Sequence, residues 1–229
     1  MKPSNAVKPK FRREAPQLRR EELIEATLAC LKKHGHEGVS VRRISAEAGV
    51  SMGLIRHHFQ GIDTLLAAAY ESLAARLLAH NSERACALDE GPAACLHAYF
   101  VASFTPEALD PAVFRTWLVF WSLVPHSKEM RAVRERTYAR ARATLERLLV
   151  PLADQARAPF RAAAAAIGLS ALMDGLWVEL SLNPRSFAAA TAVALCDDWV
   201  HGLLAGAFPG LSAVPAGTSA PGRAGLHPA

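Results

Sequence analysis

The stretch SVRRISAEAGVSMGLIRHHF, residues 40–59, indicates two short helices joined by a tight turn. Ser40 is expected to cap the first helix, because its hydroxyl can accept from a backbone N–H that lacks a helical partner. Gly49 lies where the chain must turn sharply, often with a positive φ angle. Ile55 and Phe59, four residues apart, are expected to point into a core. This layout is typical of a helix-turn-helix, whose second helix enters the major groove of DNA.

The residues that would meet DNA lie at the start of each helix and along the outside of the second. Ser51 is expected to cap the second helix, and its hydroxyl, the helix amino terminus and His58 would hold phosphates. The predicted DNA-binding residues are Ser40, Arg42, Arg43, Ser51, Met52, Gly53, Leu54, Arg56, His57 and His58. Among them, Met52, Leu54, Arg56 and His57 would face bases or the groove wall. An ordinary helical hairpin is the alternative for these twenty residues taken alone.

Two predicted helices flank this stretch. The upstream helix extends from about residue 19 to residue 34, where Gly35 ends it, and the downstream helix begins near Asp63. Their apolar faces carry Leu23, Ile24, Thr27, Leu28 and Leu31 upstream, and Leu65, Leu66, Ala69, Tyr70, Leu73 and Leu77 downstream. Each is therefore an amphipathic helix that can pack against the two short ones.

Residues 19–70 resemble the amino-terminal domain of the TetR family of repressors. The resemblance is carried by Leu23-x-x-Ala26-Thr27, Leu31, Gly35, Ser40-Val41-x-x-Ile44, Ala48-Gly49-Val50-Ser51-x-Gly53-x-Ile55, His58-Phe59 and Leu65. It implies a homodimer that binds a palindromic operator in double-stranded DNA. Arg56 stands where the family often has a phosphate-contacting tyrosine, which keeps a backbone contact and could add a guanine contact. Ile62 replaces the usual lysine, so about one unit of salt dependence per half-site is expected to be missing.

The composition fits a protein with a sizeable core, since 51% of the 229 residues are hydrophobic. The net charge of +5 is concentrated in residues 1–20, which hold seven basic residues and one acidic residue. The basic arm, residues 1–18, either contacts DNA phosphates or is a solvated disordered tail. Four cysteines without a disulfide framework and the lack of a signal-peptide pattern favour a soluble cytoplasmic protein, not one in a membrane.

The rest of the chain is predicted to form further helices, which makes the fold class all-α. They cover about residues 92–104, 111–124, 127–149, 159–182 and 186–206, with Pro151 ending the third and Ser186 capping the last. The apolar run 162–178 contains Asp174 and is expected to be a packed helix rather than a membrane span.

We assign residues 19–62 to a DNA-binding domain, with the helix-turn-helix at 40–59. Residues 63–208 would form a larger ligand-binding and dimerisation domain. Residues 209–229, rich in Pro, Gly, Ser and Ala, would form a disordered tail.

The last two predicted helices are rich in small and apolar residues. Residues 160–181 offer Ala, Gly and Ser on several faces, and residues 187–204 carry an apolar stripe of Ala188, Ala192, Leu195, Trp199 and Leu203. Two such helices per chain could form a four-helix bundle between subunits, or could be buried within one chain. A two-fold dimer would read two half-sites roughly 34 Å apart.

The carboxy-terminal region resembles the BetI branch of the TetR family. The resemblance is carried by Thr116-Trp117-Leu118-Val119-Phe120-Trp121, His126, Gly168-Leu169-x-Ala171-Leu172-Met173-Asp174-Gly175-Leu176-Trp177, and Phe104 thirteen residues before Trp117. It implies that the chain represses genes that convert choline to glycine betaine, and that choline or its aldehyde relieves repression.

A quaternary ammonium ion has no hydrogen to donate, so aromatic faces and a nearby carboxylate hold it. Trp117, Trp121 and Trp177, with Asp174 or Glu179, could supply such a cage, and Phe120 is included in the predicted ligand site. Trp117 and Trp121 are four residues apart, so they share a helix face. The alternative is that these aromatic residues belong to the core.

Other functions have less support in the sequence. It contains no Gly-rich phosphate loop, nucleophile elbow or metal signature, so neither an enzyme nor a cofactor is expected. Asp197 and His201 are four residues apart on a helix, but two ligands make a weak metal site. An architectural DNA-binding protein without an effector, and a TetR repressor answering an unrelated hydrophobic or cationic molecule, are the remaining alternatives.

Overall fold

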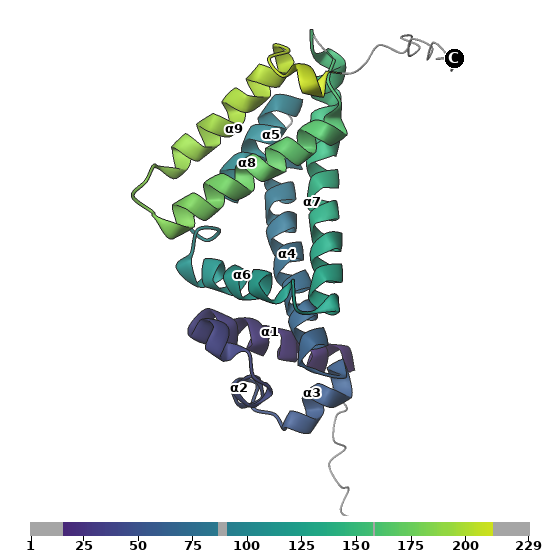
Figure 1. Cartoon of the computed structure of the whole chain (residues 1–229), viewed down its shortest axis with the longest axis vertical. Helices are drawn as coiled ribbons and strands as arrows, with labels where there is room; N and C mark the ends of the chain where they lie inside the picture. Colours follow the sequence, from purple (N-terminus) through teal and green to yellow (C-terminus); the bar gives the residue numbers. More distant parts are fainter. Residues whose placement is uncertain (1–15, 87–90, 158, 213–229) are drawn as a thin grey trace, which may run out of the picture.

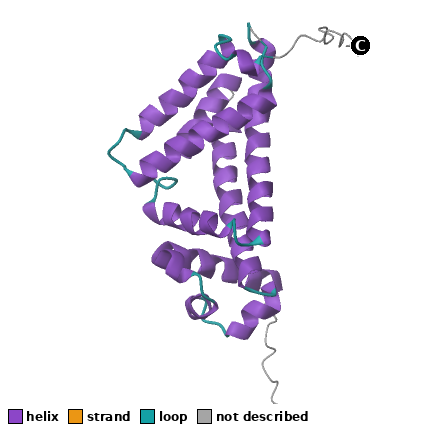
Figure 2. Cartoon of the chain, in the orientation of Figure 1, coloured by secondary structure: helices purple, strands orange, loops and turns teal. Residues whose placement is uncertain are grey.

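The computed structural model describes residues 16–86, 91–157 and 159–212, and its regular elements there are helices (Figures 1 and 2). They are α1 (Pro16–His34), η1 (Gly35–Gly38), α2 (Val41–Glu47), α3 (Met52–Phe59), α4 (Ile62–Cys86), α5 (Pro92–Ser103), α6 (Pro111–Leu123), α7 (Lys128–Gln155), α8 (Ala162–Leu182), α9 (Ala189–Leu204) and η2 (Pro209–Leu211). The predicted all-α fold class is confirmed.

The first three helices and the start of α4 enclose a small core. Its buried members are Leu23, Cys30, Ile44, Ile55, Phe59 and Leu65. Each helix contributes residues at the three- or four-residue spacing that places them on one face. α4 then runs out of this domain and packs against α5 and α7, so one continuous helix connects the two halves of the molecule (Figure 1).

The larger domain is built around α4, α5 and α7, with α8 and α9 sloping across them and α6 lying crosswise between the two domains (Figure 1). One core joins α5, α7, α8 and α9 around residues such as Phe100, Leu149 and Leu169. A second core joins α1, α4, α6 and α7 around Tyr70 and Phe120. The two cores meet at Trp177, which packs against both.

Five predicted boundaries are wrong, one of them the start of α8, which is Ala162 and not residue 159. α1 begins at Pro16, inside the predicted arm, because proline is tolerated in a helix's first turn. α7 continues past Pro151 to Gln155, since Leu152 and Ala153 are buried in the core and outweigh the hydrogen bond that proline removes. α9 begins at Ala189; the Ser186 hydroxyl instead donates to the carbonyl of Asn183.

The fifth correction concerns the predicted disordered tail, residues 209–229. Pro209–Leu211 form η2, and the carbonyl of Leu211 accepts a hydrogen bond of 2.8 Å from the backbone N–H of Arg161. These residues are therefore hydrogen-bonded to the residue that precedes α8. Residues 1–15 of the predicted arm and 213–229 of the predicted tail lie outside the described residues.

α8 is the one helix in the described ranges that is long and apolar enough to cross a membrane. It packs on α7 and α9, yet only 22% of its most apolar stretch is buried within one chain. An apolar stripe of α8 is therefore left at the surface.

Candidate functional site

The turn between α2 and α3 has most of its expected geometry. Ser40 caps α2, because its Oγ accepts a 3.1 Å hydrogen bond from the backbone N–H of Arg43. Gly49 has φ = 63°, the left-handed region that favours glycine. Ser51 occupies the N-cap position of α3, but its side chain makes no capping hydrogen bond. The predicted cap is wrong in that respect, and the exposed Ser51 hydroxyl remains open to an outside group.

α3 buries one side and exposes the side that was predicted to meet DNA. Ile55 and Phe59 are buried, whereas Met52 is 57% exposed. The exposed predicted residues are Arg42, Ser51, Met52, Gly53, Arg56 and His57, and the half-buried ones are Ser40, Arg43, Leu54 and His58. α2 and α3 lie at the end of the molecule opposite α8 and α9, so the described body of the protein leaves this surface uncovered (Figure 1).

Arg20 on α1 holds α3 in place, a role that the sequence reasoning missed. Its guanidinium lies 4.1 Å from the centroid of the Phe59 ring and donates to the carbonyl oxygen of His58. Burial, and then the nearby charges of His57, Arg20 and Arg19, lower the pKa of His58. The lowered pKa favours the neutral form of His58 in the protein without DNA.

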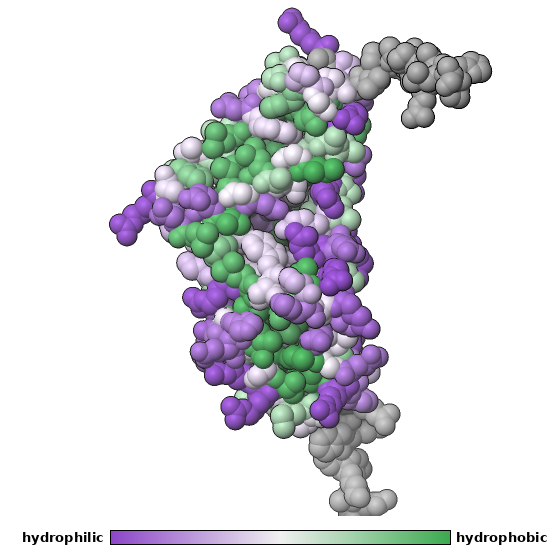
Figure 3. Space-filling view, viewed as in Figure 1, coloured by the Kyte–Doolittle hydropathy of each residue, from purple (hydrophilic) through white to green (hydrophobic). Residues whose placement is uncertain are grey.

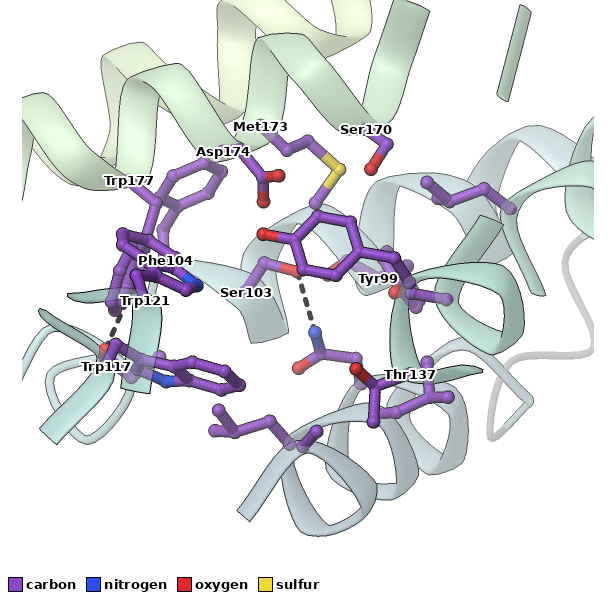
Figure 4. A pocket seen from close by; sticks show the side chains of 18 residues that line it. Tyr99, Ser103, Phe104, Trp117, Trp121, Thr137, Ser170, Met173, Asp174 and Trp177 are labelled. Carbon is purple, nitrogen blue, oxygen red and sulfur yellow. Dashed lines mark hydrogen bonds between the residues drawn. The ribbon is translucent and has the colours of Figure 1, made fainter. Parts of the chain in front are cut away.

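A cavity of about 190 Å³ lies inside the larger domain, between α4, α5, α6, α7 and α8 (Figure 4). Its aromatic lining is Tyr99, Phe104, Trp117, Trp121, Tyr138 and Trp177. Figure 4 shows the three tryptophans gathered on one side of the cavity, with Asp174 beside them. The structure thus brings together four of the five predicted ligand-binding residues.

The three indole rings hold one another in orientation. The centroids of Trp117 and Trp121 are 6.0 Å apart, and Trp121 meets Trp177 edge-on at 6.2 Å. The Trp177 indole N–H donates to the carbonyl of Ala108 at 2.9 Å, which anchors that ring to the loop before α6. Rings fixed in this way present preorganised faces to a ligand.

Phe120 and Glu179 do not belong to this cavity. Phe120 is fully buried and stacks on Tyr70 at 5.0 Å with only 5° between the ring planes. A residue one position from Trp121 is turned by about 100° around the helix, so Phe120 faces α4 instead. The prediction for Phe120 is therefore wrong, and exposed Glu179 leaves Asp174 as the acidic residue of the lining.

Asp174 has accessible surface because it faces the cavity, yet protein atoms surround it closely. Burial raises the pKa of its carboxyl group, while a hydrogen bond from Tyr138 and the charge of Arg134 act in the opposite direction. The Arg134 guanidinium lies 4.2 Å from the centroid of the Tyr138 ring. A partly desolvated carboxylate without a direct ion pair gains from a cation placed beside it.

Comparison with known proteins identifies both halves of the chain. Residues 23–69 match the family described as bacterial regulatory proteins, tetR family, and residues 92–205 match the BetI-type transcriptional repressor, C-terminal domain. The HTH-type transcriptional regulator BetI of Serratia proteamaculans is 34% identical over 197 residues, covering 84% of this chain and 96% of that protein. The chain belongs to the TetR family of transcriptional regulators, with a carboxy-terminal domain of the BetI type.

Solved structures agree with this family. A transcriptional regulator of Pseudomonas aeruginosa PAO1 is 46% identical, with a TM-score of 0.78 over 87% of this chain and 96% of that one. A regulator of Saccharomonospora viridis in complex with choline shares the fold, with a TM-score of 0.63 at 19% identity over 81% of this chain and 96% of that one. Because the relatives are named transcriptional regulators, this TetR-family chain is a regulator and not an enzyme.

Two helices of this TetR-family chain connect the cavity to the DNA-binding domain. α4 lines the cavity with Leu77 and packs on α1 and α3 at its other end. α6 carries Trp117 and Trp121, and its Arg115 donates to the carbonyl of Lys32, near the end of α1, at 2.7 Å. A displacement of either helix would therefore reach α1.

Asp197 and His201, the pair considered above as a weak metal site, do not belong to a larger cluster of ligands in the described residues. Asp197 instead contacts His97 Nδ1 at 2.8 Å, and no group of three or more metal-ligating side chains occurs in the described part of the chain. A hydrogen bond with His97 on the surface accounts for Asp197.

The sequence reasoning missed the cavity residues on α4, α5 and α7. The polar ones among them are Asn81, Tyr99, Ser103, Thr137 and Tyr138. They lie on helices with ordinary amphipathic spacing, so nothing local distinguishes them from core residues. Only their distance from Trp117 and Asp174 in the fold could have identified them.

Proposed function

We propose that this chain is a dimeric cytoplasmic repressor that releases its operator when a choline-like cation enters the cavity. The observation that carries the proposal is the cavity itself, whose lining combines three tryptophans on one side with the carboxyl group of Asp174 beside them (Figure 4). Cation–π contacts contribute roughly 0.5–2 kcal/mol each, with the larger values where water is excluded. The choline complex of the Saccharomonospora viridis regulator supports the same ligand class for this fold.

The DNA-binding part of the proposal rests on α3. In each subunit, α3 enters the major groove of one half-site of a near-palindromic operator. Arg56 and His57 contact base edges or the groove wall, while Ser51 and His58 contact phosphates. Arg42 and Arg43 at the start of α2 would reach the adjacent backbone, as basic side chains near a groove do.

The dimer would form through α8 and α9. Ile167 and Leu182 of α8 are 56% and 64% exposed, and Leu195 of α9 is 44% exposed. Figure 3 shows hydrophobic residues gathered over these two helices. Gly175 lies on the same stripe, and a Cβ there would touch nothing in the described chain, so another helix could approach closely. Pairing these faces gives a four-helix bundle between subunits.

Ligand binding would couple to DNA through α4 and α6. A cation drawn between Trp121 and Asp174 pulls α6 toward α8, and the contact of Arg115 with Lys32 transmits that shift to α1. The ligand can change operator affinity only by its differential affinity for the two arrangements. A change from 1:99 to 99:1 needs about 5.5 kcal/mol.

A fluorescence anisotropy titration tests the proposal. Labelled DNA from upstream of the chain's own gene is bound by the protein and then titrated with choline and other small quaternary ammonium ions. Release by choline at millimolar concentration or below supports the proposal. Release only by an uncharged hydrophobic compound would favour the unrelated-effector alternative, and no release by any compound would favour a DNA-binding protein without an effector.

A further inference from the structure

The cavity has a second, uncharged polar wall that the cation cage does not use. Figure 4 shows Ser103, Tyr99 and Thr137 away from the side where the three tryptophans gather. Asn81 of α4 joins this wall, and its Nδ2 donates to the Oγ of Ser103 at 2.9 Å. The cavity is thus aromatic and acidic on one side, and neutral and hydrogen-bonding on the other.

The hydrogen bonds fix how the Asn81 amide is turned. The Ser103 hydroxyl donates its only hydrogen to the carbonyl of Tyr99 at 2.8 Å, so its oxygen can only accept from Asn81. The amide NH₂ must therefore face Ser103. Its second hydrogen serves the hydrogen bond with Tyr99, and the lone pairs of Oδ1 leave capacity for a further partner.

Tyr99 keeps this wall neutral. Burial raises the pKa of its hydroxyl to about 12, partly offset by a hydrogen bond with Asn81. The hydroxyl therefore stays protonated at neutral pH and can donate as well as accept. No arginine, lysine or histidine lines the cavity in the part of the chain that the structure describes.

We infer that Asn81 and Tyr99, oriented by Ser103, form a subsite that hydrogen-bonds to an oxygen of the ligand. This subsite would select quaternary ammonium ions bearing an alcohol or aldehyde. This inference rests on the proposed function, because it uses the cage around Asp174 for the ammonium group. A neutral oxygen can exchange hydrogen bonds with Asn81 and Tyr99. A carboxylate would instead enter a cavity that already holds Asp174, without a cationic residue on the lining to neutralise it.

Binding measurements with three probes test the subsite. Choline, propyltrimethylammonium (a methyl group in place of the hydroxyl) and glycine betaine are each titrated into the intact protein by calorimetry. We expect choline to bind at least fivefold more tightly than propyltrimethylammonium, and glycine betaine to bind more weakly than either. In Asn81→Leu, which keeps the branched shape and the number of heavy atoms, the choline preference should vanish while propyltrimethylammonium affinity changes by less than twofold.

The matched control is Gln155→Ala, which removes an exposed amide at the end of α7, outside the cavity. It should retain the wild-type preference. Equal affinities of the wild type for choline and propyltrimethylammonium would overturn the subsite and leave the cation cage standing. Equal weakening of both ligands in Asn81→Leu would do the same, because it indicates a packing role. Binding of neither cation would overturn the cage and the subsite together.

Discussion

The predicted DNA-contacting residues of α2, α3 and their caps form a surface, here called the recognition surface. This surface and the cavity differ in how their residues are distributed along the chain. The predicted DNA-contacting residues lie within Ser40–His58, and two short helices present them. The cavity residues extend from Ala74 to Trp177 on five helices. A local site is fixed by capping, turns and helix periodicity, whereas a dispersed site exists only after the larger domain has folded. The two sites should therefore respond differently to substitution.

The largest effect is expected from separating the subunits without touching either site. Ile167→Glu places a charge on the exposed stripe of α8, where pairing with a second chain would bury it. Operator affinity should fall by about 10²–10⁴-fold, because each half-site then binds alone. Analytical ultracentrifugation should show monomers.

The control for this substitution is Val150→Glu, which changes an exposed apolar residue on α7. It should remain a dimer with unchanged operator affinity. A dimeric Ile167→Glu protein that binds the operator normally would rule out pairing through α8.

The next effect concerns the recognition surface alone. Arg56→Ala removes an exposed guanidinium from the outer side of α3. A base contact is worth about 1–3 kcal/mol, so gel-shift affinity should fall by about tenfold to a hundredfold per half-site. Choline affinity should stay unchanged. Arg142→Ala, an exposed arginine on α7, serves as the control, and near-wild-type operator binding by Arg56→Ala would refute the assigned role.

Asp174→Asn should change ligand binding and not DNA binding, the opposite of Arg56→Ala. Choline affinity should fall by about tenfold or more, and operator affinity should stay unchanged. The groups around Asp174 are Tyr70 from α4, Tyr99 from α5, and Arg134 and Tyr138 from α7. The three tyrosines have raised pKa values and stay neutral near pH 7.

Because choline is permanently charged, the pH dependence of its binding reports on the protein. Burial raises the pKa of Asp174, so choline affinity should decline as pH falls through that raised pKa. The stability of the ligand-free protein should change in the opposite direction. Its free energy of unfolding should rise as pH falls, because Asp174 then takes up its proton. Asp174→Asn should flatten the affinity profile, and a wild-type profile without any decline toward acid pH would remove Asp174 from the ligand site.

The smallest effect is expected at Arg20, which acts on DNA only through α3. Arg20→Ala loses the contact over Phe59 and the hydrogen bond to His58, so operator affinity should fall by about threefold to tenfold. Arg20→Lys keeps the charge but loses the flat guanidinium and should recover only part of the loss. Full recovery in Arg20→Lys would indicate a direct phosphate contact instead of support for α3.

The same contrast explains what the sequence could and could not predict. Ser40, Gly49, Ile55 and Phe59 follow local rules, and the structure confirms their placement. Trp117 and Trp121 were found together because helical spacing links residues four apart. Phe120 was misplaced because spacing does not say which neighbouring helix a face meets. Asn81, whose cavity partners come from another helix, carried no local signal at all.

Pro151 and Ser186 show that residue types typical of helix ends do not always mark where a helix ends or begins. A proline normally ends a helix, but the buried Leu152 and Ala153 keep α7 intact for one more turn. A serine before an apolar run usually caps it, but Ser186 completes the turn with Asn183 instead. In both places, tertiary packing or a competing local hydrogen bond outweighs the pattern.

Energetic coupling between the cavity and the recognition helices can be measured through thermodynamic linkage. If choline weakens operator binding by some factor, operator DNA must weaken choline binding by the same factor. Calorimetric titration of choline into the free protein and into its operator complex measures both affinities. We predict distinctly weaker choline binding to the complex; equal affinities in the two titrations would contradict the account.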